Sequence, residues 1–145
     1  MADRFVLLDT GPLVALFNSA DQDHASARAW FKACDRPLVT TEAVITEMAY
    51  LLSNSTEMQT GALQWIEKAR AHRRLEIAPV DEHAALAALI ERYGDLPCDY
   101  ADATLVAVGN ARDIRDIATL DERDFSVYRL KGNRSFRLVF ARDRT

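Results

Sequence analysis

The sequence predicts an α/β domain with a mainly parallel central sheet. Short apolar segments typical of buried strands alternate along the chain with longer segments typical of helices, and signals for β-hairpins are few. The length of 145 residues suits one domain with one core, and an apolar fraction of 49% is too high for a disordered chain. We therefore expect a single domain over residues 1–145.

The first half of the chain is expected to contain two strands and four helices. An apolar run predicts the first strand, and Pro12 suits the first turn of the helix that follows it. Aspartates that can serve as N-caps precede the second helix, and threonines precede the third. In order, these elements are strand 4–9, helix 11–17, helix 24–33 after Asp21 or Asp23, strand 38–39, a helix from Thr40 or Thr41 to about Ser53, and helix 56–72.

The second half of the chain is expected to contain three strands and two helices. Asp81 can cap the first of these helices, and Gly94 can close it, because glycine readily adopts the left-handed conformation common after helix ends. In order, these elements are strand 75–78, helix 82–93, helix 100–111, strand 116–120 and strand 135–140.

Composition argues against a membrane protein. No apolar stretch approaches the roughly 20 residues that span a bilayer, and we find no basic segment followed by the apolar run of a signal peptide. Cys34 and Cys98 have no metal-ligand spacing, and free thiols are typical of cytoplasmic proteins. We therefore expect a cytoplasmic protein that does not enter a membrane.

Charge is distributed unevenly along the chain. The net charge is −4, but residues 129–145 carry six basic side chains against one acid, Asp143, so this segment is +5 and the first 128 residues carry −9. An acidic body with a basic tail is compatible with a metal site beside a phosphate-binding surface. A solvated basic terminus is the alternative interpretation.

Two aspartates directly follow expected strands. Asp9 ends Phe-Val-Leu-Leu-Asp, and Asp121 ends Ile-Ala-Thr-Leu-Asp. Ligands of parallel sheets bind in the crevice at the carboxyl ends of the strands, which these side chains can reach. Asp9 can instead cap the next helix. Asp121, followed by Glu122, Arg123 and Asp124, is by itself more typical of a turn, and Asp124 has a weaker case still.

Glu47 is predicted to lie on the buried side of a helix. Its neighbours three and four positions away are Ala43, Val44, Tyr50 and Leu51. A carboxylate there would cost free energy unless it were paired, either with a metal ion or with a buried Arg or Lys.

Asp99 and Asp102 lie three residues apart at the start of the expected helix 100–111, so they are neighbours on one face. The same face continues through Leu105, Val106 and Gly109 toward the core. One acid, Asp99, can be explained as a helix cap. Because a second cap is not needed, Asp102 is the better candidate for a ligand.

A metal ion explains why acids would gather at buried edges. Carboxylates within a few ångströms repel one another, and one or two Mg²⁺ or Mn²⁺ ions relieve that repulsion. Such a metal polarises a phosphate and lowers the pKa of a bound water. The scattered His24, His72 and His83 indicate no zinc site. The sequence therefore points to metal-dependent phosphodiester chemistry.

Four segments carry a family resemblance. They are Leu-Leu-Asp-Thr-Gly-Pro-Leu-Val-Ala-Leu, Thr-Glu-Met-Ala-Tyr-Leu-Leu, Leu-Pro-Cys-Asp-Tyr-Ala-Asp-Ala-Thr-Leu-Val-Ala and Ile-Ala-Thr-Leu-Asp-Glu-Arg-Asp-Phe. Each motif alone is weak, but the ordered set resembles the PIN domain, and particularly the VapC-type toxins of bacterial and archaeal toxin–antitoxin pairs. The resemblance spans about residues 4–140.

The resemblance implies a parallel sheet flanked by helices on both faces and a site made of acids. Asp9, Glu47, Asp102 and Asp121 match the catalytic, metal-binding acids of the family, and Asp99 is common in this branch and can share the metal. Thr10 can help to hold the first acidic loop or a water. The expected cofactor is one or two Mg²⁺ or Mn²⁺ ions.

The resemblance also implies an activity and partners. The family cleaves RNA with a metal-activated water and leaves a 5′-phosphate and a 3′-hydroxyl, and its VapC members are inhibited by a small antitoxin and are often homodimers. The candidates for an RNA-binding rim, each of which can equally be a simple exposed cation, are Arg112, Arg115, Arg123, Arg129 and Lys131.

Two other functions are compatible with parts of the pattern. One is a non-catalytic PIN-like protein that binds RNA or acts as a scaffold, although all four acids are retained here. The other is an aspartyl-phosphate-forming protein, such as a haloacid dehalogenase-type phosphatase or a receiver domain. Dehalogenase-type phosphatases usually have a second Asp two residues after the first, where this chain has Gly11.

Overall fold

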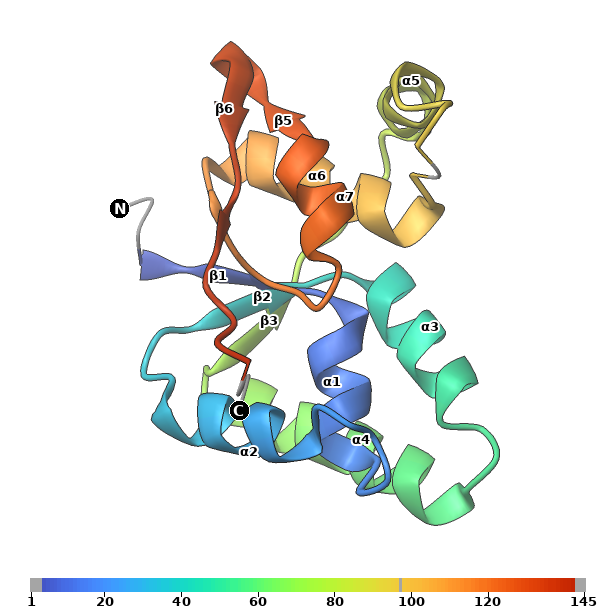
Figure 1. Cartoon of the computed structure of the whole chain (residues 1–145), viewed down its shortest axis with the longest axis vertical. Coiled ribbons are helices and arrows are strands. Elements are labelled where there is room, and N and C mark those ends of the chain that lie inside the picture. The colour runs from blue at the N-terminus through green and yellow to red at the C-terminus, as the bar shows by residue number, and fades with distance from the viewer. Residues whose placement is uncertain (1–3, 97, 143–145) are drawn as a thin grey trace.

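The computed structural model describes residues 4–96 and 98–142 and confirms the α/β class (Figure 1). A central sheet of five strands has the order β3-β2-β1-β4-β7, and every pair of neighbours is parallel. Its strands are β1 (Val6–Leu8), β2 (Leu38–Thr40), β3 (Leu75–Ile77), β4 (Asp116–Ala118) and β7 (Arg137–Leu138). Strand order therefore reverses between β1 and β4, which makes this the topological switch point of the sheet.

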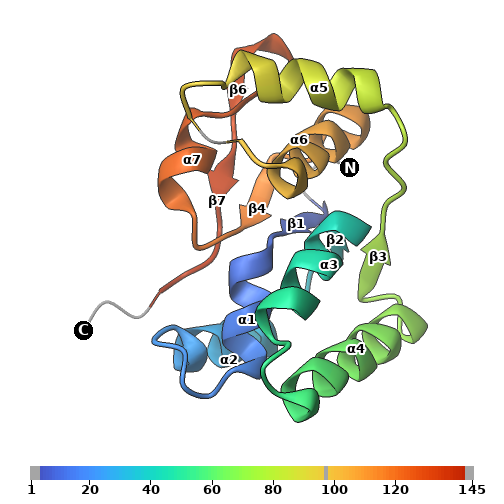
Figure 2. The ribbon, with the colours of Figure 1, turned by 90° about the vertical axis from the view of Figure 1, so that its right-hand side faces the viewer.

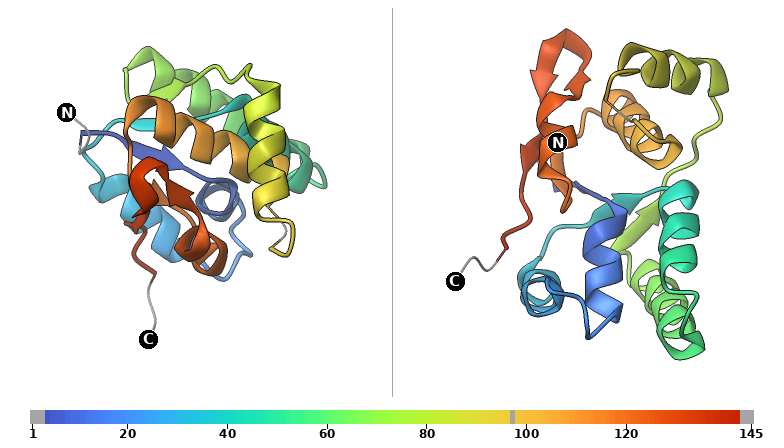
Figure 3. Two further views of the ribbon diagram at one scale, coloured as in Figure 1. Left: turned by 90° about the horizontal axis from the view of Figure 1, so that it is seen from above. Right: turned by 45° about the vertical axis from the view of Figure 1, so that its right-hand side comes forward.

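Helices cover both faces of the sheet, as expected (Figure 2). One layer contains α1, α2 and α4, and the other contains α5, α6 and α7; α3 packs against both α1 and α6. Figure 3 shows α1 and α3 side by side on one side of the sheet. The bounds are α1 (Thr10–Phe17), α2 (His24–Ala33), α3 (Glu42–Leu51), α4 (Thr56–Ala71), α5 (His83–Arg92), α6 (Tyr100–Arg112) and α7 (Glu122–Val127).

The central strands are buried on both faces, which explains their continuous apolar runs. All residues of β1, β2 and β4 are buried, and they form one core with the inner faces of the helices. Asp116 in β4 is a charged residue among these apolar strands. It is 6% exposed and forms ion pairs with Arg36, just before β2, and with Arg137 in β7. Two guanidinium groups thus compensate the burial of this carboxylate.

The prediction of one strand over residues 135–140 is wrong in its bounds. The chain first forms an antiparallel hairpin between β5 (Arg129–Leu130) and β6 (Arg134–Ser135), then buries Phe136 and enters the parallel sheet as β7. The hairpin turn contains Gly132 at φ 76°, a conformation that favours glycine. Strands of two residues are too short for their alternation to be recognised in the sequence, and α7, with six residues, is too short for a helical period.

The expected helix caps are confirmed in part. The Thr41 hydroxyl accepts a hydrogen bond from the Val44 N–H and caps α3, whereas Thr40 donates to the Leu8 carbonyl. Asp21 accepts from the Asp23 N–H, and Asp23 pairs with Arg142, so both side chains are engaged away from α2.

The cap prediction for α5 is wrong. Glu82, not Asp81, occupies the N-cap position, and Gly94 follows the helix without the positive φ expected of it. A side-chain cap depends on the exact first residue of the helix, and here the helix begins one residue later than the sequence pattern suggests. Among the described residues, no helix is long and apolar enough to span a membrane.

Two helical glycines provide a test of the packing. A Cβ at Gly109 in α6 would lie 2.9 Å from the Ile114 carbonyl oxygen and 3.0 Å from Leu130 Cδ2, whereas a Cβ at Gly61 in α4 would meet nothing within 4 Å. We expect Gly109→Ala to lower the free energy of unfolding by about 1–3 kcal/mol through overpacking. Gly61→Ala, the matched control, should raise it by about 0.5–1 kcal/mol. Urea unfolding measures both, and equal effects of the two substitutions would contradict the close packing of α6.

Candidate metal centre

Acidic side chains gather at the carboxyl ends of β1 and β4, where the strand order of the sheet reverses. Asp9 follows β1 directly, and its N–H bonds the Ala118 carbonyl at the end of β4. Asp121 follows β4 as the N-cap residue of α7, and Asp102 lies in the first turn of α6. Parallel sheets bind ligands at this position.

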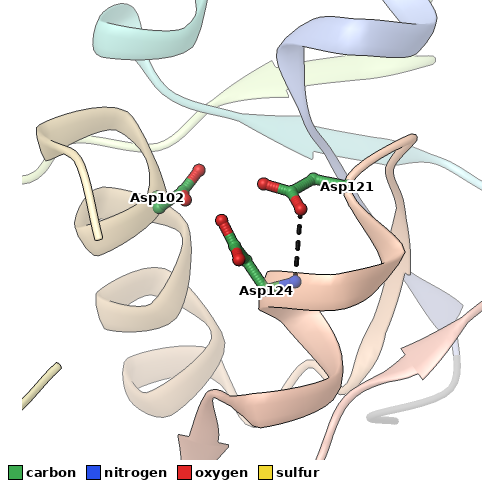
Figure 4. A group of neighbouring side chains, drawn as sticks. All are labelled: Asp102, Asp121 and Asp124. Carbon is green, nitrogen blue, oxygen red and sulfur yellow. Dashed lines mark hydrogen bonds between the residues drawn. The ribbon is translucent and has the colours of Figure 1, made fainter. Parts of the chain in front are cut away.

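Asp102, Asp121 and Asp124 form a compact group of carboxylates (Figure 4). One oxygen from each lies within 4.8 Å of the others. Figure 4 shows that Asp102 points from α6 toward the start of α7, from which Asp121 and Asp124 face it. Asp121 also caps α7 by accepting the Asp124 N–H at 3.2 Å. Asp102 is buried, and the other two are half-buried.

Asp124 is the member of this group that sequence reasoning discounted. It lies three residues after Asp121, in the first turn of α7, so the helix places both carboxylates on one side. The same spacing separates Asp99 from Asp102, where it was recognised. The signal for Asp124 was thus present, but a polar run after a strand resembles an ordinary turn when the short helix is not foreseen.

Asp9 is held in the site by a hydroxyl. Asp9 is 6% exposed and accepts a hydrogen bond from Thr119 Oγ1 at 2.7 Å. Thr119 Oγ1 in turn accepts a hydrogen bond from the Asp121 N–H at 2.9 Å. Thr119 therefore links Asp9 to Asp121. Asp9 occupies the N-cap position of α1, but its side chain is directed to Thr119 rather than to the helix.

Burial is the main cause of the altered titration of Asp9. It raises the pKa of Asp9 to about 6, against the opposing hydrogen bond from Thr119, and the charges of Glu47 and Asp121 raise it further. Burial likewise raises the pKa of Asp102, followed by the charges of Asp9 and Asp99. The pKa of Asp121 is also raised, first by burial. Asp9 is thus electrostatically part of the site, although it lies outside the compact group of three.

Gly11 allows the first acidic loop to approach the fourth motif. A Cβ at Gly11 would lie 3.0 Å from the Cβ of Leu120, tighter than ordinary van der Waals contact. The absence of a side chain at Gly11 therefore lets the start of α1 lie against the loop that carries Asp121. The residue that distinguishes the chain from dehalogenase-type phosphatases thus has a steric reason to be glycine.

Glu47 is half-buried, and the apolar stripe expected around it is partly wrong. Tyr50 and Leu51 are 76% and 52% exposed, because α3 turns Val44 and Met48 to the core instead. Within residues 4–96 and 98–142, no basic side chain pairs with Glu47. Its charge contributes to the raised pKa of Asp9, so it lies near the site without joining the compact group.

Asp99 caps α6. The exposed Asp99 accepts the Asp102 N–H at 2.8 Å through Oδ1, and its charge helps to raise the pKa of Asp102. The cap role of Asp99 is therefore observed, and its role as a metal ligand stays a prediction.

The expected RNA rim is dispersed. Arg123 is exposed, and its charge lowers the pKa of Asp121, so it lies beside the site. Arg112 ends α6, about 15 Å along the helix from Asp102, and pairs with Glu76. Arg115 and Arg129 bond backbone carbonyls, and Lys131 is exposed on the hairpin. The last part of the basic tail, including Arg144, lies outside the described residues.

The site fits a hard divalent cation. Its donors are carboxylate and hydroxyl oxygens, the ligands preferred by Mg²⁺ and Mn²⁺. Across the described part of the chain, no Lys, Arg or His forms an ion pair with Asp9, Asp102, Asp121 or Asp124. Beside Asp9, the buried Thr10 Oγ1 has no hydrogen-bond partner among the described residues. Uncompensated acids and an unsatisfied hydroxyl are what a bound cation and its waters would satisfy.

Fold and site together define an α/β protein with an acidic, oxygen-rich site, able to hold a divalent cation, at the switch point of a parallel sheet. The sequence model of the PIN domain family matches residues 6–130. The chain therefore belongs to the PIN domain family, and the expected resemblance is confirmed.

Individual relatives agree with this membership. The chain is 28% identical over 134 residues to Ribonuclease VapC26 of Mycobacterium tuberculosis (strain ATCC 25618 / H37Rv), covering 92% of this chain and 99% of that protein. Its fold resembles the crystal structure of M. tuberculosis VapC20, described as a sarcin-ricin loop cleaving toxin, with a TM-score of 0.70 and 20% identity over 81% of this chain and 91% of that one. The structural likeness supports the fold.

The raised pKa of Asp9 predicts how the metal-free protein responds to pH. Because the pKa rises from 3.8 to about 6 on folding, the folded state holds a proton that the unfolded state has released, so stability falls as pH rises through this window. Between about pH 4.5 and about pH 7.5, wild-type protein in EDTA should lose about 2 kcal/mol more unfolding free energy than Asp9→Asn. Urea unfolding at both pH values measures this, and a smaller loss in the wild type than in the variant would contradict the burial argument. Added Mg²⁺ should reduce the difference.

Proposed function

We propose that this chain is a metal-dependent endoribonuclease of the VapC type. The observation that carries the proposal is the group of uncompensated carboxylates around Asp102 at the switch point of a PIN-domain sheet. The similarity to a ribonuclease over 92% of the chain supports RNA as the substrate.

The acids divide the work of holding the cofactor. Asp9, Asp102 and Asp121 would hold one or two Mg²⁺ or Mn²⁺ ions, with Glu47, Asp99 and Asp124 completing the acidic shell. When bound, such an ion polarises the scissile phosphate and lowers the pKa of a water. Thr119 links Asp9 to Asp121, and the Thr10 hydroxyl, which has no hydrogen-bond partner among the described residues, can hold a water beside Asp9.

The reaction is a hydrolysis at phosphorus. The water oxygen forms a bond to phosphorus, the bond between phosphorus and the 3′-oxygen breaks, and the leaving oxygen takes up a proton. A carboxylate of the acidic shell accepts the proton of the attacking water. The products are a 5′-phosphate and a 3′-hydroxyl. Arg123 beside Asp121 can contact the phosphate backbone outside the acidic centre.

The biological role we propose is that of the toxin in a cytoplasmic toxin–antitoxin pair. An acidic centre to which no described residue supplies a cation can accept a basic side chain from a small antitoxin, which would occupy the place of the metal. A homodimer is the assembly we propose for the active protein, in keeping with the resemblance to VapC-type proteins.

The acids of the site weaken both alternative functions. An aspartyl-phosphate enzyme would need Asp9 open to a phosphoryl group, whereas here it is 6% exposed and hydrogen-bonded to Thr119. A non-catalytic scaffold would not need the four acids that this chain retains.

Substitution of the acids tests the nuclease. Asp9→Asn and Asp102→Asn should each lower RNA cleavage about a hundredfold or more, because each removes a charge that holds the cation. Cleavage is measured by gel assay with Mg²⁺ or Mn²⁺, and 5′-phosphate ends by ligation that requires them. The matched control is Glu67→Gln, whose side chain is 81% exposed on α4. Undiminished cleavage in both site variants, with the fold intact by circular dichroism, would contradict the assigned site.

Expression in a bacterial host tests the toxin role. Induced expression of the wild-type chain should arrest growth of the host, and expression of the Asp102→Asn variant should not. Co-expression of a short neighbouring reading frame from the source genome should restore growth and co-purify with the chain. Normal growth despite active nuclease in the cells would exclude a toxin.

A further inference from the structure

Tyr128 is buried beside the candidate metal centre and belongs to none of the recognised motifs. It lies at the C-cap of α7, is 0% exposed, and packs edge-on against Phe125 and Tyr93 with ring centroids 5.0 Å apart in both pairs. These contacts fix the position of the ring, and a phenylalanine at this position could make the same contacts. The packing alone therefore does not explain the hydroxyl.

The hydroxyl of Tyr128 is directed at the central acid of the site. It donates a hydrogen bond to Asp102 Oδ2 at 2.8 Å, between two residues that are 26 positions apart. Cys98 also lies beside the Tyr128 hydroxyl, but a thiol sulfur is only a weak acceptor. The carboxylate is thus the stronger partner for the Tyr128 proton.

One short helix consequently controls all three carboxylates of the compact group. α7 has six residues: its N-cap is Asp121, its first turn carries Asp124, and its C-cap residue holds Asp102. The described residues place no donor on Asp102 Oδ1, which leaves that oxygen available to a cation. The hydrogen bond restricts rotation of the carboxylate about its last torsion angle, which is otherwise broad.

We propose that Tyr128 is a positioning residue, which orients the Asp102 carboxylate toward Asp121 and Asp124 and thereby sets the affinity of the site for its divalent cation. Residues that hold metal ligands by hydrogen bonds typically change metal affinity or activity by about 10–100-fold when substituted. Tyr128 would act through Asp102 and contact neither the metal nor the RNA. The inference rests on the proposed function in one respect: the cation that Asp102 holds is taken to be the cation that the nuclease uses.

Paired Tyr→Phe substitutions test the inference. Tyr128→Phe removes the hydroxyl on Asp102, and Tyr93→Phe removes a hydroxyl from the same aromatic cluster, where it accepts the Arg129 N–H at 2.9 Å. We expect Tyr128→Phe to weaken Mn²⁺ binding about tenfold, measured by titration calorimetry or by the EPR signal of free Mn²⁺, and Tyr93→Phe to leave it within about twofold. Excess Mg²⁺ should restore RNA cleavage by Tyr128→Phe, because the acids themselves remain.

A second substitution separates positioning from general destabilisation. In an Asp102→Asn background, Tyr128→Phe should cause much less than its tenfold loss of Mn²⁺ affinity, since the two groups act as a unit. Equal Mn²⁺ binding by wild type and Tyr128→Phe, or the same loss in both backgrounds, would overturn the inference. Failure of the proposed function gives a different result: wild type then binds Mn²⁺ more tightly than Tyr128→Phe but cleaves no RNA.

Discussion

Electrostatic repulsion among carboxylates at the switch point of the sheet is the constraint on which the rest of the structure depends. Asp9 and Asp102 are both buried, and each raises the free energy of the other's charged form. A fold that only had to be stable would not place them together. The ends of β1 and β4, the N-terminus of α6 and the loop before α7 all converge on this point, so the arrangement of the elements serves the site.

The same sheet treats another buried acid in the opposite way. Asp116 in β4 has two arginine partners, from the segment before β2 and from β7, and no role in the site. Asp102, similarly buried at 7% exposure, has a tyrosine hydroxyl and an exposed helix cap as its neighbours. Buried acids that stabilise a fold are paired with cations. Among the described residues no basic side chain pairs with Asp102, and this is the strongest physical argument for a ligand from outside the chain.

The sequence predicted the parallel architecture well, because buried strands appear as continuous apolar runs and helices of eight or more residues leave a periodic signal. It also predicted that Asp9 follows a buried strand and that Asp102 lies on the buried face at the start of a helix, and both positions are confirmed, while their metal-binding role stays a prediction. It missed what depends on short elements: α7, the β5–β6 hairpin, and with them the placement of Asp124. The prediction for Glu47 was partly wrong for another reason. A stripe of apolar residues on a helix does not say which of two adjacent faces the core selects, and α3 buries Val44 and Met48 rather than Tyr50.

The geometry of the site therefore depends on packing as much as on its acids. A helix of six residues is too short to be stable by propensity, so tertiary contacts must hold it. Phe125 and Tyr128, both fully buried, provide those contacts from the side of α7 that faces the core. The aromatic side chains fix the helix, and the helix fixes the spacing of Asp121 and Asp124 from Asp102. Changes in the aromatic cluster can thus alter cation binding without touching a carboxylate, which sequence motifs based on the acids alone do not reveal.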